Sequence, residues 1–279
     1  MADLLSPAAI PSASTSGVIQ GLSTLVTRFL LAAVPALSAP SKKSPDAARP
    51  LDTLLGNLVT STLLPLLPAF HALSRAHLTA LFRPGKGKAQ ANHDARPDAL
   101  AFLHATLHTL ADLARTQSGR PSPSALLASA HAAVVRAGVR ELEALYAPAA
   151  AYGDAPPPRR PASGEKQRQR QDDARVEKLA RRDALWYLCA VLHAAIPGAA
   201  LDAGGTSAAL REGVCTALAG LLRPRAGDED GEGAMGGGPV GDRRGGRVQC
   251  PGRRGRGLLG GVEREMLLAV AEKVWLSQG

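Results

Sequence analysis

Residues 94–119 read DARPDALAFLHATLHTLADLARTQSG, and this stretch decides the fold class. Its leucines recur at intervals of three and four residues, at Leu100, Leu103, Leu107 and Leu110. That spacing places them on one face of an α-helix, which then buries this face against other elements. Asp94 and Pro97 are typical of a helix start, and Ser118-Gly119 is typical of a helix end. The stretch therefore predicts a core-facing helix from near residue 97.

The composition of the whole chain favours the same kind of element. Of 279 residues, 52 are Ala and 41 are Leu, whereas Ile contributes 3 and the aromatic residues 9. Ala and Leu are the strongest apolar helix formers, and the residues that favour strands are scarce. Further helices are expected to start near residues 18, 51, 68, 123, 166, 206 and 258, with no fixed repeat length. We therefore expect an all-α fold, either an irregular multi-helix bundle or a helical-repeat-like array of about 7–8 helices.

Changes in composition divide the chain into six regions. A helical region at 17–146 is followed by a Pro-rich linker at 147–165 and a second helical region at 166–222. The Ser-, Pro- and Ala-rich residues 1–16 and the Gly/Arg-rich residues 223–257 cannot supply a core, so both are predicted to be disordered. Residues 258–279 form a C-terminal helix in this interpretation.

Three local features refine the helical prediction. Pro65 and Pro68 predict two helices that meet at a proline bend. Gly138, inside the helix expected from residue 123, marks a point where another element can approach closely. The uncharged stretch 184–201 resembles a membrane segment, but Pro197 leaves too few helical residues to span a bilayer, so a buried core helix is expected.

Charge and cysteine content bear on the compartment. The formal net charge is +9, and the three cysteines, Cys189, Cys215 and Cys250, form no CxxC pair. We expect an intracellular protein, cytoplasmic or nuclear, in a reducing environment and without membrane contact. Arg28 lies near the centre of the first apolar helix, which argues against a span. The same helix and the scarcity of acids before residue 46 leave a mitochondrial presequence open as an alternative.

His104 and His108 are the candidate metal ligands. They lie one helical turn apart, which is the spacing at which one helix offers two imidazoles to a metal ion. A third ligand would have to come from elsewhere, for example from His131 or Asp112, and the sequence does not fix one. We therefore expect two packed or solvated histidines, with no metal and no cofactor.

Two Arg-Gly clusters resemble the boxes of RNA-binding tails, in which guanidinium groups contact phosphates and stack on bases. Their candidate nucleic-acid-binding residues are Arg243, Arg244, Arg247, Arg253, Arg254 and Arg256. The tract has no aromatic residue, and translation of GC-rich noncoding sequence would give the same composition. RNA contact and a nonfunctional insert therefore both remain open, and deletion of 227–257 separates them.

Three LxxLL strings occur, with their leucines at Leu51/Leu54/Leu55, Leu63/Leu66/Leu67 and Leu218/Leu221/Leu222. In a leucine-rich helical chain such strings usually pack into the core. The alternative is an exposed leucine face that docks into the groove of a partner.

By elimination, the leading hypothesis is a non-enzymatic α-helical scaffold or adaptor that binds another protein through leucine-rich helix faces. Nucleic-acid binding through the Arg-rich segments 159–182 and 243–256 is the first alternative, and an enzyme with a dispersed site is the second. A pocket of converging ionisable residues would favour the enzyme, whereas an exposed apolar groove would favour the adaptor. The sequence leaves the oligomeric state open.

Overall fold

The computed structural model confirms the all-α fold. It describes residues 13–38, 48–82, 94–117, 121–146, 164–199, 206–222 and 261–276. Within these ranges nearly every residue is helical and no strand occurs. Most of the predicted linkers at 147–165 and 223–257 lie outside the described residues.

The helices follow one another as α1 Ala13–Leu37, α2 Ala48–Leu58, η2 Val59–Leu63, α3 Leu64–Phe82, α4 Ala95–Thr116, α5 Pro121–Tyr146, α6 Gly164–Ala195, η3 Ile196–Ala199, α7 Thr206–Leu222 and α8 Gly261–Leu276. The first helix begins at Ala13, earlier than the start near residue 18 that the sequence predicts. Since α2, η2 and α3 are continuous, the described chain holds seven helical rods, joined by the short η3 turn and by linkers.

The proline bend is resolved differently from the prediction of two separate helices. One turn of π-helix, Val59–Leu63, joins α2 to α3, and the backbone N–H of Leu64 donates to the carbonyl of Val59. Pro65 has no N–H to donate, so the usual i to i−4 ladder is already interrupted at this point. The wider turn absorbs the missing donor without breaking the rod, which is a common role of π-bulges.

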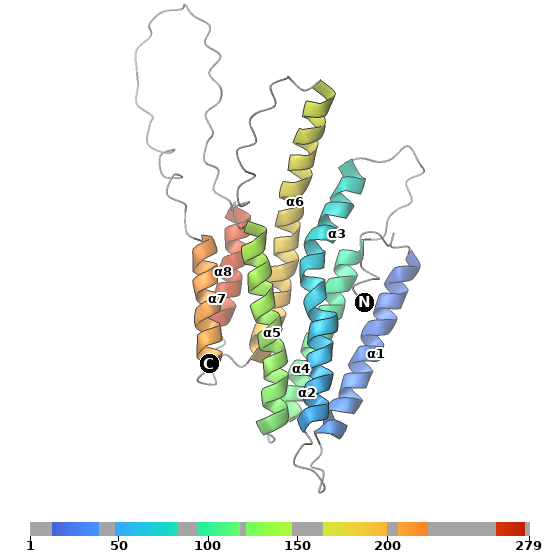
Figure 1. The fold of residues 1–279 in the computed structure, drawn as a ribbon, viewed down its shortest axis with the longest axis vertical. Helices are drawn as coiled ribbons and strands as arrows, with labels where there is room; N and C mark the ends of the chain where they lie inside the picture. The colour runs from blue at the N-terminus through green and yellow to red at the C-terminus, as the bar shows by residue number, and fades with distance from the viewer. Residues whose placement is uncertain are drawn as a thin grey trace, which may run out of the picture.

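The rods lie side by side in a bundle, with α1 at one edge and α7 and α8 at the other (Figure 1). Helix α6 packs against α3, α4, α5 and α8, while α1 packs mainly on α4 and α7 packs on α5 and α8. One buried apolar cluster includes side chains from α1 to α8. The helices on either side of the Pro-rich linker therefore share a single core.

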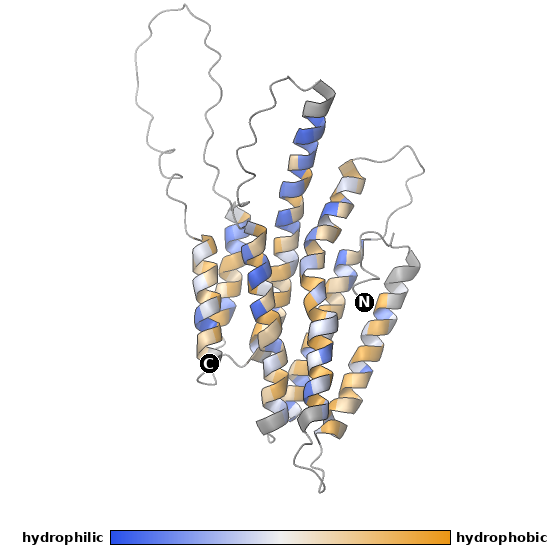
Figure 2. Cartoon of the chain, viewed as in Figure 1, coloured by the Kyte–Doolittle hydropathy of each residue, from blue (hydrophilic) through white to orange (hydrophobic). Residues whose placement is uncertain are grey.

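Helix α6 changes character along its length. Its N-terminal half projects beyond its neighbours and is strongly hydrophilic, whereas its second half runs among them (Figure 2). From Ala184 to Ile196 most residues are buried, including Leu185, Leu188 and Leu192. This agrees with the core-helix prediction for the uncharged stretch.

Two glycines mark close approaches between the later elements. A Cβ on Gly138 of α5 would lie 2.9 Å from Cδ2 of Leu192, so the predicted close approach is present. A Cβ on Gly198 of η3 would lie 2.6 Å from Cγ of His131 and closer still to two other ring atoms. The His131 ring is fully buried, and only a glycine leaves room for it at this position.

Candidate functional site

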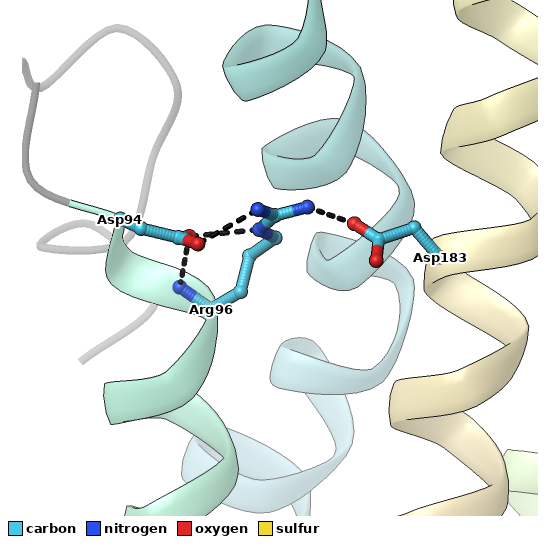
Figure 3. A network of polar contacts seen from close by, with 3 residues as sticks. All are labelled: Asp94, Arg96 and Asp183. Atoms are coloured by element: carbon cyan, nitrogen blue, oxygen red, sulfur yellow. Dashed lines mark hydrogen bonds and ion pairs between the residues drawn. The ribbon is translucent and has the colours of Figure 1, made fainter.

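A network of charged side chains joins the start of α4 to the middle of α6 (Figure 3). Asp94 caps α4 by accepting from the backbone N–H of Arg96 at 3.1 Å. The Arg96 guanidinium donates to both Asp94 carboxylate oxygens at 2.7 Å and also pairs with Asp183. Its Cζ lies 5.8 Å from the ring centre of Tyr187. The sequence gives the cap, but nothing in it links Arg96 to an aspartate 87 residues away.

The charge network shifts the pKa of Asp94. Burial alone would raise this pKa, but hydrogen bonds from the Arg96 side chain and backbone, together with the Arg96 charge, lower it below the ordinary value. Arg96 is 8% exposed, and the two carboxylates balance the charge of its buried guanidinium group. The network therefore acts as a structural anchor between α4 and α6.

A pocket of about 320 Å³ lies beside this anchor and is lined by His77, Leu78, Arg96, Leu179, Arg182, Asp183, Trp186 and Met266. Its charged groups are already paired: Arg96 with Asp183, and Arg182 with Glu263 at 3.6 Å. Burial, and then the Arg96 charge, lower the pKa of His77, so its ring is neutral near pH 7. Charged side chains that are paired with one another stabilise the bundle, and few charged groups in the pocket remain available to bind or react with a ligand.

The structure places no third metal ligand beside His104 and His108 among the residues that it describes. His104 and His108 sit edge to face with ring centres 6.2 Å apart, and His104 Nε2 lies 3.1 Å from the carbonyl oxygen of Ala190. His131, a suggested third ligand, has its ring nitrogens 3.0 and 3.1 Å from the carbonyls of Leu127 and Leu107. Among the residues the structure describes, no group of three or more His, Cys, Asp or Glu side chains could hold a metal ion.

The buried histidines make stability depend on pH. Burial lowers the pKa of His131 and of His104 below 6.5 despite the nearby carbonyls. A histidine whose pKa is lower in the folded state binds fewer protons there than when unfolded, so stability falls as the pH drops below 6.5. We expect chemical denaturation between pH 7.5 and 5 to show this loss.

Substitution of His131 identifies the source of the loss. His131→Leu should reduce the pH dependence, because it removes a buried imidazole whose pKa is lowered in the folded state. A wild-type free energy of unfolding that stays constant over this range would contradict the assignment.

The Arg-Gly residues Arg243, Arg244, Arg247, Arg253, Arg254 and Arg256 all lie outside the described residues. Of the other Arg-rich segment, the exposed half of α6 carries Arg168, Arg170 and Arg175. Asp172 and Asp173 are interspersed among them, so this surface has mixed charge rather than the uniformly basic character that favours phosphate binding.

The leucines of the three LxxLL strings face the core. All members of Leu63/Leu66/Leu67 are buried, as are Leu51, Leu55 and Leu218, and the remaining three are partly buried. These strings are therefore core-packing patterns, as expected for a leucine-rich helical chain, and the alternative of an exposed leucine face is not found at them.

An apolar groove lies instead between α5 and α7. It has a volume of about 410 Å³ and is lined by Arg136, Val139, Arg140, Glu143, Ala209, Leu210, Gly213, Val214 and Ala217. Val139, Leu210 and Val214 are nearly buried and form its floor. On the α7 wall Ala209, Gly213 and Ala217 are spaced by four residues, and a Cβ on Gly213 would meet open space.

Two cations line the α5 side of the groove. Arg136 and Arg140 are exposed and lie one helical turn apart. Within the described parts of the chain neither forms an ion pair. The sequence shows the i, i+4 arginines and the small-residue spacing, but it cannot show that α5 and α7 bring them together.

The scan of family models, the search of curated proteins and the search of solved structures each found no match to this chain.

Proposed function

We propose that this protein is an α-helical adaptor that binds a helical segment of another protein in the α5–α7 groove. The observation that carries the proposal is the combination of an apolar floor, an α7 wall of small residues, and two arginines on the rim that form no ion pair with any described residue. An amphipathic helix that enters a groove needs apolar side chains for its floor and complementary charges for its rim.

The chemistry of the groove specifies the segment. Its α7 wall is made of Ala and Gly, so a third helix can approach closely without meeting large side chains. Arg136 and Arg140 call for carboxylates one turn apart on the incoming helix, while Glu143 at the end of the row calls for a basic residue. The preferred ligand is thus an acidic amphipathic helix.

A peptide titration tests this directly. The probe is a fluorescent 16-residue helix with Leu and Ala on one face and Glu on the other, and its counterpart carries Lys in place of Glu. We expect the acidic peptide to bind and the basic one to bind at least about tenfold more weakly, because like charges then meet across the rim. Fluorescence anisotropy measures both affinities.

A steric block supplies the matched variant. Gly213→Leu fills the groove, and Gly220→Leu adds the same side chain to the same helix outside it; a Cβ at either position meets open space. Both variants should fold, since replacing glycine in a helix favours the helix. Only Gly213→Leu should weaken binding, by about tenfold or more. Equal binding by both variants would rule out the groove.

The nucleic-acid alternative predicts a different result. RNA binding would appear as an affinity that falls steeply with salt and is lost when 227–257 is deleted. That deletion should leave binding of the acidic peptide unchanged if the groove is the docking site.

A further inference from the structure

Helix α1 presents two apolar faces, of which only one is covered. Ile19, Leu30 and Val34 are at most 1% exposed and belong to the core. On the opposite side Leu25, Phe29 and Leu31 are 63%, 52% and 50% exposed. Figure 2 shows α1 as a largely hydrophobic helix at the edge of the bundle, with one side facing no other helix.

Among the residues that the structure describes, two helical segments are long and apolar enough to cross a membrane, Ile19–Leu37 and Pro50–Phe82. In the most apolar window of the second, 33% is buried, and its exposed positions in α2 and η2 include Asp52, Asn57 and Thr60, so a core helix with a polar outer face accounts for it. In the most apolar window of Ile19–Leu37, only 17% of the residues are buried. Core packing therefore accounts for the α2–η2 part of the second segment, while α3 exposes Leu81 and Phe82 at its C-terminal end. Core packing leaves the outer face of α1 unexplained.

The charge of α1 indicates which kind of surface could cover its exposed face. The helix contains no acidic residue, and its single charged side chain, Arg28, is exposed on the same side as Leu25 and Phe29. An arginine can keep its apolar stem among lipid chains while the guanidinium reaches the phosphates. An uncovered apolar face that carries a cation and no anion is complementary to an anionic lipid surface.

We propose that the outer face of α1 binds the surface of an anionic lipid membrane, with Leu25, Phe29 and Leu31 in the apolar layer and Arg28 at the headgroups. The helix lies along the surface rather than across it, because its inner face remains packed on α4. This proposal does not depend on the α5–α7 groove, and together the two surfaces would hold a bound partner at a membrane.

Vesicle flotation of the full chain tests the proposal. We expect binding to vesicles of phosphatidylcholine with 30% phosphatidylglycerol, chosen as about the anionic content of a charged membrane, and weaker binding to phosphatidylcholine alone. The double substitution Leu25→Ser/Phe29→Ser should lower partitioning by about tenfold or more. Arg28→Gln should reduce the preference for anionic vesicles.

A matched control uses exposed apolar side chains elsewhere. Leu268→Ser/Trp275→Ser alters α8, whose Leu268 and Trp275 are 54% and 65% exposed, and should leave partitioning unchanged. Circular dichroism checks that both double variants fold. The proposal is overturned if wild type does not float, if both double variants lose binding equally, or if Leu25→Ser/Phe29→Ser instead converts a dimer to a monomer.

Discussion

Gly198→Ala should lower the free energy of unfolding by about 3 kcal/mol, the upper end of the usual range for overpacking. The added methyl group would overlap the His131 ring, which is fully buried and whose two nitrogens lie 3.0 and 3.1 Å from the carbonyl oxygens of Leu127 and Leu107. Neither a rigid ring nor the η3 backbone can move away cheaply. Chemical denaturation measures the loss.

Two controls test whether overlap with the His131 ring causes the destabilisation by Gly198→Ala. A Cβ on Gly138 would meet only the flexible side chain of Leu192, with Cδ2 at 2.9 Å and Cγ at 3.3 Å. The cost of Gly138→Ala should therefore be below about 1 kcal/mol after the gain in helix propensity. In a His131→Ala background the ring is absent, and Gly198→Ala should then cost little. An unchanged penalty in that background would show that the overlap is not its cause.

Asp94→Ala should lower the free energy of unfolding by about 2–3 kcal/mol. About 1 kcal/mol comes from the lost helix cap. The rest arises because Arg96, whose side chain is 9% exposed, keeps only Asp183 as a partner. Equilibrium denaturation of the purified variant gives the value.

An exposed aspartate–arginine pair on the same helix provides the comparison. Asp112 and Arg115 are bonded at 2.5 Å, but their side chains are 60% and 75% exposed. Asp112→Ala should therefore cost less than about 0.5 kcal/mol. Similar losses for the two aspartate substitutions would show that burial of Arg96 contributes nothing.

The helices could be predicted from the sequence because each depends on local spacing. The leucine periodicity of 100–110 and the cap at Asp94 are written within one segment, and both agree with the structure. The join at Val59–Leu63 could not be predicted, since the same prolines are compatible with a break, a kink or a π-turn. Neighbouring helices decide among these.

The candidate site could not be predicted from the sequence, because it depends on contacts between distant segments. The Arg96–Asp183 pair and the α5–α7 groove each join residues that are far apart in sequence. The LxxLL strings, by contrast, behave as their helical spacing predicts, because their leucines are buried or partly buried in the core. The exposed Gly213 is informative only once Val139 of α5 is seen beside it.

Photocrosslinking from α7 tests whether the α5–α7 groove binds a protein helix. A benzophenone side chain replaces Ala209, in the groove, or Ala219, exposed on the same helix outside it. In nuclease-treated cell extract, Ala209 should yield a discrete protein adduct that the acidic peptide displaces, and Ala219 should not. The same adducts from both positions, or an Ala209 adduct that the acidic peptide does not displace, would contradict the account.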